Sequence, residues 1–182
     1  MKLITPVRRL FSANVVVFIT FFAGSAQIGN TGTVGTWTTK PVSREHNQAN
    51  QLSYVKIVRA AKQHNSDRVV FEFVGPFPNY GIEYLKGHFY DGEGGRERIK
   101  SAGNLFVQVE FNMIPASDEQ VKFTETKNFV PKGRLRLPSV QSVSDQGLFE
   151  GFYDFVIGVS ARKPFRVTEL SNPPRLVVDF KH

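Results

Sequence analysis

The sequence predicts an all-β protein, an antiparallel β-sandwich of about eight short strands, and three observations support that prediction. Apolar residues recur at every second position in several short runs, which is the period of a half-buried strand. Gly, Pro, Asn and Asp separate these runs. Beyond the N-terminal segment, no window longer than about ten residues keeps the apolar period of a helix. Strands without intervening helices pair antiparallel, so two packed sheets are the expected architecture.

The chain begins with a segment typical of export signals. Lys2, Arg8 and Arg9 precede an uncharged, mostly apolar run over 10–23, and Ala26 stands at a cleavage position. This run is short for a membrane span, which needs about 20 apolar residues. We therefore expect residues 1–26 to be a signal peptide and the protein to be exported, to a periplasm or to the extracellular side of a cell envelope. A retained membrane anchor is the alternative.

A compositional change divides the rest of the chain into a tail and a domain. Residues 27–51 are rich in Gly, Thr, Asn and Gln, contain Trp37 as their single large aromatic residue and lack a sustained apolar period. This composition predicts a flexible linker. Residues 52–182 then form one domain of ordinary size, in which the strand patterns begin.

Four runs in this domain show the alternation most clearly. Apolar and polar side chains face opposite ways in 104–113, 67–73, 80–84 and 175–180. Pro-containing turns at 75–78 and 172–174 interrupt the strand ladders, because proline lacks an N–H donor. Weaker strands are expected at 54–59, 140–144, 153–159 and 165–170, a flexible loop at 91–95, and a long loop insertion at 115–138.

Charge and cysteine content exclude several classes of function. Without residues 1–26 the chain has 23 − 3 = 20 basic and 16 acidic residues, a net charge of +4. The basic residues are spread singly along the sequence, whereas nucleic-acid binders gather them into a stripe, so no nucleic-acid partner is expected. The chain has no cysteine. This excludes disulfides, thiolate nucleophiles and cysteine-ligated metals.

The sequence also lacks the spacings of common catalytic and metal sites. Its four histidines are isolated, with no HExxH pattern, and no GxSxG elbow occurs. We therefore expect no metal, no cofactor and no enzymatic activity. One catalytic alternative remains, because two carboxylates on a sheet face can hydrolyse glycosides. Solvated positions on an open sheet face are the simpler interpretation of the acidic residues that suit this role, which are Glu72, Glu83, Glu110, Asp154 and Asp179.

Four residues are candidates for ligand binding. Tyr80 and Tyr84 combine flat apolar rings with hydroxyl groups and can stack on a sugar. Arg68 and Arg175 offer bidentate donors to carboxylates. Each arginine is also followed, four residues later in the same strand, by an acid, Glu72 or Asp179. A surface ion pair within each strand is therefore the competing expectation for these arginines.

Four segments together resemble a known family. They are Ser66–Phe73 (SDRVVFEF), Tyr80–Tyr84 (YGIEY), Arg162–Val167 (RKPFRV) and Asn172–Asp179 (NPPRLVVD). In this order and spacing they resemble the AMIN-like domain of secreted bacterial proteins and, more distantly, the AMIN domain of cell-wall amidases and secretins. The resemblance covers the chain from about Leu52 onward. It implies a small β-sandwich, placement in the cell envelope and binding to peptidoglycan.

The expected function is therefore an exported, non-catalytic binding module of the bacterial cell envelope that recognises peptidoglycan or a wall-associated protein. Three alternatives remain open. The first is a small-molecule carrier in which the strands close into a β-barrel around an apolar pocket. The second is a scaffold subunit of an envelope assembly, in which an exposed strand edge pairs with a partner. The third is the carboxylate hydrolase.

Overall fold

The computed structural model describes residues 35–47, 51–92, 95–113 and 130–182. The segment predicted to be a signal peptide, 1–26, and most of the insertion predicted at 115–138 lie outside these residues. Those of its residues that are described, 130–138, form no strand or helix. In the described part of the chain no helix is long and apolar enough to cross a membrane.

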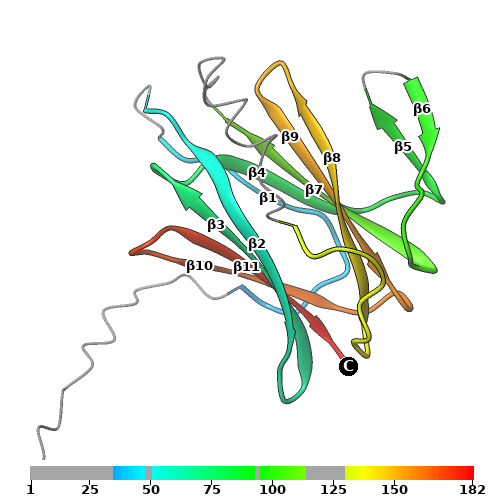
Figure 1. Ribbon diagram of the computed structural model, residues 1–182. Helices are drawn as coiled ribbons and strands as arrows, with labels where there is room; N and C mark the ends of the chain where they lie inside the picture. The colour runs from blue at the N-terminus through cyan, green and yellow to red at the C-terminus, as the bar shows by residue number, and fades with distance from the viewer. Residues whose placement is uncertain (1–34, 48–50, 93–94, 114–129) are drawn as a thin grey trace, which may run out of the picture.

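The strands form two open antiparallel sheets that pack face to face, with a small hairpin beside them (Figure 1). The five-stranded sheet contains, in spatial order, β1 (Val42–Arg44), β4 (Asn79–Tyr84), β7 (Leu105–Asn112), β9 (Phe152–Val159) and β8 (Val140–Phe149). The four-stranded sheet contains β10 (Phe165–Leu170), β11 (Arg175–Lys181), β3 (Ser66–Val74) and β2 (Tyr54–Lys62). The hairpin pairs β5 (Phe89–Gly92) with β6 (Gly95–Arg98).

This arrangement confirms the predicted all-β sandwich and corrects one alternative. Each of the eight predicted strands is present, with the polar and apolar faces that the alternation predicted. The sheets stay open and do not close on each other. A carrier of the β-barrel type is therefore wrong for this chain, because such a carrier needs a closed wall of strands.

The core lies between the two sheets and is built largely from phenylalanine. Phe71 of β3 meets Phe111 of β7 and Phe155 of β9 edge to face, with ring centroids 5.2 Å apart in both pairs. Phe73 meets the same Phe111 ring at 5.1 Å. Edge-to-face contacts place the positive ring edge on the negative ring face, which adds to the gain from burial. These contacts join strands of opposite sheets, so they hold the two layers together.

The N-terminal part of the described chain differs from the prediction of a flexible linker over 27–51. Residues 42–44 form β1, which pairs with β4. Thr38 exchanges two backbone hydrogen bonds with Phe165, both of 2.8 Å, and the N–H of Gly35 donates to the carbonyl of Val167. Residues 35–47 thus lie along the edges of both sheets. We call these residues the N-terminal strap.

A second difference concerns the glycine-rich segment 91–95. It was expected to be a flexible loop, but Asp91, Gly92 and Gly95 belong to the β5–β6 hairpin. Next to this hairpin, Phe106 of β7 points away from the main core and packs with Ile99 and Val156. This small cluster covers part of the outer face of the five-stranded sheet. Elsewhere that face carries polar residues such as Gln108 and Asp154 together with the exposed ring of Phe152.

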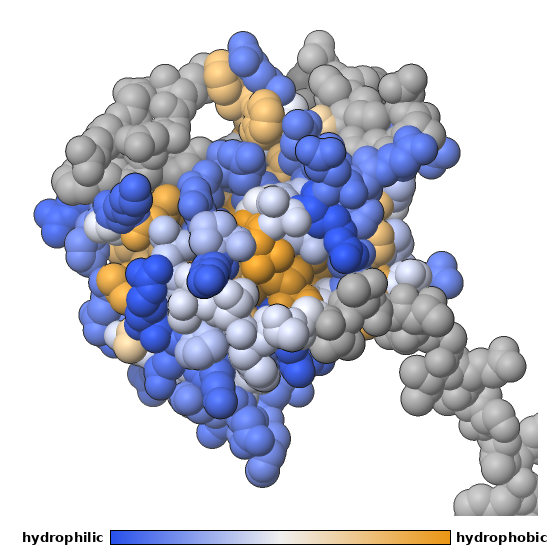
Figure 2. Space-filling view, turned by 180° about the vertical axis from the view of Figure 1, so that it is seen from behind, coloured by the Kyte–Doolittle hydropathy of each residue, from blue (hydrophilic) through white to orange (hydrophobic). Residues whose placement is uncertain are grey.

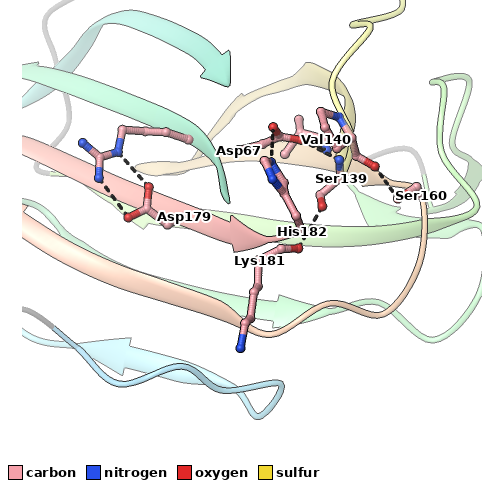
Figure 3. A network of polar contacts seen from close by, with 9 residues as sticks. Asp67, Ser139, Val140, Ser160, Asp179, Lys181 and His182 are labelled. Carbon is pink, nitrogen blue, oxygen red and sulfur yellow. Dashed lines mark hydrogen bonds and ion pairs between the residues drawn. The ribbon is translucent and has the colours of Figure 1, made fainter. Parts of the chain in front are cut away.

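A buried carboxylate ties the C-terminus to the two sheets (Figure 3). The side chain of Asp67 is fully buried, and its Oδ2 accepts backbone hydrogen bonds from Ser139, at 2.5 Å, and Val140, at 2.9 Å. Its Oδ1 lies 3.0 Å from Nε2 of His182. The hydroxyl of Ser139 in turn donates to the carbonyl of Lys181. Because each of these contacts is internal, we assign Asp67 a structural role.

Candidate functional site

The structure separates the four residues that the sequence singled out for ligand binding. Tyr80 and Tyr84 are 7% and 8% exposed and belong to the core between the sheets. Arg68 and Arg175 lie on the outer face of the four-stranded sheet, opposite to its buried face. One patch cannot contain all four side chains. The two arginines lie among other charged residues on this outer face.

That surface carries an excess of positive charge. We call it the arginine face, and it consists of Lys56, Arg59, Arg68, Arg166 and Arg175 together with the two acids Glu72 and Asp179. Five cations against two carboxylates leave an excess of three positive charges. In the strand register Arg166, Asp179 and Arg68 stand side by side across β10, β11 and β3. This row forms the centre of the arginine face.

Asp179 holds the central row together. Its side chain is fully buried, and it accepts two hydrogen bonds from Arg68, at 2.7 and 3.0 Å, and one from Arg166, at 2.9 Å. Burial opposes ionisation of this carboxyl, but the two guanidinium groups outweigh burial and keep the pKa of Asp179 below its usual value. The same hydrogen bond raises the pKa of Arg68. The hydrogen bonds to Asp179 therefore fix the side chains of Arg68 and Arg166 in position.

The ion pairs on this face run between strands, which corrects the expectation of pairs within a strand. Arg68 pairs with Asp179 of β11, and Glu72 pairs with Arg59, at 2.7 Å, and Lys56, at 3.2 Å, both in β2. Residues four apart in a strand are separated by about 13 Å, too far for an ion pair, whereas residues opposite each other on neighbouring strands are within reach.

The remaining cation of the arginine face is the least constrained by carboxylates. Arg175 stands opposite Glu72 in the register, and its Nε donates to the carbonyl of Pro173 at 3.2 Å. A guanidinium group has five N–H donors in a planar fork, so this one bond leaves donors for a ligand. Of the two arginines predicted from the sequence, Arg175 is thus the one that forms no ion pair with a carboxylate of the described residues.

Trp37, which was not among the predicted ligand-binding residues, borders the arginine face. Trp37 of the N-terminal strap lies under the guanidinium group of Arg166, whose central carbon is 4.7 Å from the ring centroid, and 38% of Trp37 is exposed. Cation–π contact of this kind fixes the ring in position. The sequence placed Trp37 in a linker, and only the pairing of the strap with β10 brings it to this surface.

The two tyrosine hydroxyls have partners inside the protein. The Tyr80 hydroxyl donates to Glu169 at 2.9 Å, and burial together with this carboxylate raises the pKa of Tyr80. His46 and Arg44 of the strap also contact Glu169, at 3.2 and 3.1 Å. The hydroxyl of Tyr84 donates to the carbonyl of Lys163 at 2.7 Å. These contacts link the two sheets and the strap. The two tyrosine hydroxyls therefore have a structural role.

The acidic residues considered for hydrolysis fall into two groups on opposite sides of the molecule. Glu72 and Asp179 are bound by cations on the arginine face. Glu83, Glu110 and Asp154 lie on the outer face of the five-stranded sheet, where Glu110 stands opposite Asp154 in the register. Burial, and then the charges of Asp154 and Glu83, raise the pKa of Glu110. Within residues 35–47, 51–92, 95–113 and 130–182, no group of three or more His, Cys, Asp or Glu is arranged to hold a metal ion.

Comparison with known proteins yields one match. The family model of the AMIN-like domain matches residues 53–182, which is most of the chain. The comparison with curated proteins gives no match. No solved structure matches either.

Proposed function

The chain belongs to the AMIN-like family, and from this membership we propose that it is a non-catalytic module that binds peptidoglycan, or a wall-associated partner, through its arginine face. The family is associated with the bacterial cell envelope, and its domains are generally non-catalytic binding modules. Export of the chain, expected from residues 1–26, is part of the proposal.

One observation carries the choice of surface. The arginine face presents a fixed row of guanidinium groups on a sheet that no other layer of the described protein covers on that side. Wall peptides end in carboxylates, and a planar guanidinium group binds a carboxylate through two parallel hydrogen bonds. The exposed ring of Trp37 at the border of this face offers a flat apolar surface for a sugar. The face thus supplies both kinds of contact that a glycopeptide needs.

Co-sedimentation of the purified chain with peptidoglycan sacculi tests the proposal. The double variant Arg59→Gln/Arg175→Gln removes two cations that do not hold Asp179, so the row Arg166–Asp179–Arg68 stays intact. We expect the double variant to bind sacculi at least about fivefold less, since each charged contact is worth up to about 1 kcal/mol. Binding of the unaltered chain should weaken as salt is added.

The matched control removes two exposed cations elsewhere, Lys86→Gln/Lys100→Gln, and should bind as the unaltered chain does. Equal losses in both double variants would show attraction by net charge alone. Enrichment no greater than that of an unrelated basic sandwich protein would remove wall binding and leave the scaffold alternative, in which a strand edge contacts an envelope protein.

A further inference from the structure

A groove lies on the outer face of the five-stranded sheet, on the side of the molecule opposite to the arginine face. Its volume is about 260 Å³. The view from behind the molecule shows an uneven surface, with apolar areas set among hydrophilic side chains (Figure 2). The groove runs over three neighbouring strands, β1, β4 and β7, and its lining consists of Pro41, Val42, Ser43, Gly81, Ile82, Glu83, Gln108 and Glu110.

The hollow exists because one strand position has no side chain. Gly81 stands between Ser43 and Glu110 in the strand register. It faces outward, because its neighbours Tyr80 and Ile82 face the core. A Cβ atom added to Gly81 would meet no atom within 4 Å. The groove is therefore open space bounded by the side chains of the two adjacent strands.

Among the described residues the groove has negative charge without a countercharge. Glu83 and Glu110 line it, and the first is exposed. In the described part of the chain neither carboxylate has a lysine, arginine or histidine within ion-pair distance. Burial and neighbouring acids both disfavour the charge on Glu110. A cation placed in the groove would remove this unfavourable crowding.

From this charge and shape we propose that the groove is a docking site for a lysine-bearing peptide segment of a partner protein. The ammonium group of one lysine would lie between the carboxylates of Glu83 and Glu110. Its aliphatic stem would pass over Gly81 and contact Pro41 at the edge of the groove. Lysine suits such a site because its stem packs on apolar surface while its charged end binds polar groups.

The size of the groove supports a single side chain as the occupant. Pockets for drug-sized ligands have volumes of about 300–1,000 Å³, and the groove falls just below that range. It lies on an open sheet face, so an extended segment can cross it and insert one side chain. The excess positive charge of the arginine face disfavours binding of a cationic segment on that opposite side of the molecule.

Calorimetric titration of the purified chain with the peptide acetyl-Ala-Lys-Ala-Lys-Ala-amide tests the inference. We expect saturable binding that is lost when both lysines are Nε-acetylated, because acetylation removes the positive charge. The double variant Glu83→Gln/Glu110→Gln should bind at least about fivefold more weakly. In an NMR titration the amide signals of Ser43, Gly81 and Gln108 should shift, and that of Arg68 should not.

Two further variants separate docking in the groove from general attraction. Gly81→Leu fills the hollow without removing charge and should abolish binding while the melting temperature stays close to that of the unaltered chain. Glu45→Gln removes an exposed acid that does not line the groove and should bind normally. The inference is overturned if Gly81→Leu binds the peptide as well as the unaltered chain does, or if Glu45→Gln weakens binding as much as Glu110→Gln. It is also overturned if the acetylated peptide, or the free diamine cadaverine, binds as tightly as the lysine peptide.

The outcome does not depend on the function proposed above. Peptidoglycan binding was assigned to the arginine face, and its test variants, Arg59→Gln and Arg175→Gln, leave the groove intact. Failure of sacculus binding with retained peptide binding would overturn only the former proposal. The reverse result would overturn only the groove inference.

Discussion

A single buried carboxylate organises the arginine face. The side chain of Asp179 lies on the outer face of the sheet between those of Arg68 and Arg166, and the side chains of both arginines are partly exposed to solvent. A buried charge is tolerated when hydrogen bonds and opposite charges replace its water. Removing the carboxylate of Asp179 would leave the charges of Arg68 and Arg166 close together without an opposite charge between them. Asp179 is therefore required both for stability and for the fixed position of the two arginines.

Replacing Asp179 by asparagine should lower the free energy of unfolding at pH 7 by about 2–3 kcal/mol, a value reduced from the fully buried case because both arginines are partly exposed. Because folding lowers the pKa of Asp179, the carboxylate contributes its stability above the unfolded pKa of about 3.9 and loses it as the pH falls below that value. Urea denaturation at pH 7 and at pH 3 measures the difference. The difference in free energy of unfolding between the unaltered chain and the Asp179→Asn variant should be smaller at pH 3 than at pH 7. An equal difference at both pH values would contradict this account.

Tyr80 shows why residue type alone did not identify ligand contacts. The sequence correctly placed its side chain on the same strand face as Ile82 and Tyr84. That face is the core, and the hydroxyl reaches Glu169 from the opposite sheet. A buried hydroxyl needs a hydrogen-bond partner, and here a residue 89 positions away supplies it. Nothing in the local sequence around Tyr80 or Glu169 predicts that contact.

At the scale of strands, glycine positions distinguish close packing from open surface. Gly158 of β9 lies directly against the backbone of Ala102, and a Cβ atom added there would overlap the carbonyl oxygen of Ala102 and crowd the hydroxyl of Ser142. Gly81 of β4 has no atom near the corresponding position. Both residues lie in strands of the same sheet. The two glycines therefore have different reasons for lacking a side chain, close approach of the chain in one case and the groove in the other.

Alanine substitutions test this distinction. Gly158→Ala should lower the free energy of unfolding by about 1–3 kcal/mol, because the backbone of Ala102 must move to make room. Gly81→Ala should leave stability unchanged or raise it by up to about 1 kcal/mol, since alanine restricts the unfolded chain without a clash in the folded one. Urea unfolding of both variants provides the comparison. Similar effects of the two substitutions would show that the groove over Gly81 is not open.

Short strands were the elements that the sequence did not predict. β1 has three residues, and β5 and β6 have four each. Runs this short hold too few alternations to be distinguished from a polar loop. β1 exists because it pairs with β4, which lies far along the chain, and because Val42 packs against the core. Its formation is a consequence of the assembled sandwich.

At the scale of the whole molecule, the N-terminal strap is part of the folded body although it lies before the region that matches the family. The match begins at residue 53, whereas residues 35–47 supply β1, the contacts of Arg44 and His46 with Glu169, and the ring of Trp37 beside Arg166. The strap contacts both sheets at their edges. The folded body thus includes a segment of linker-like composition that precedes the family match.

Truncation to residues 53–182 should lower the free energy of unfolding by about 2 kcal/mol or more relative to residues 35–182. The shorter chain loses the backbone hydrogen bonds of the strap, each worth about 1 kcal/mol, and leaves the carboxylate of Glu169 with fewer partners. Thermal and urea unfolding of the two purified fragments measure the effect. Equal stability would mean that the strap rests on the sandwich without stabilising it.

The sequence by itself determined the class of fold, the position of eight strands and which side of each strand is buried, because alternation with period two is a local property of a half-buried strand. It also carried the family resemblance, through four strand segments in a particular order. The tertiary structure alone decided which charges meet, where Trp37 lies and where the groove opens. Those features depend on the register between strands that are distant in the chain, and a run of residues does not contain the identity of its neighbour across the sheet.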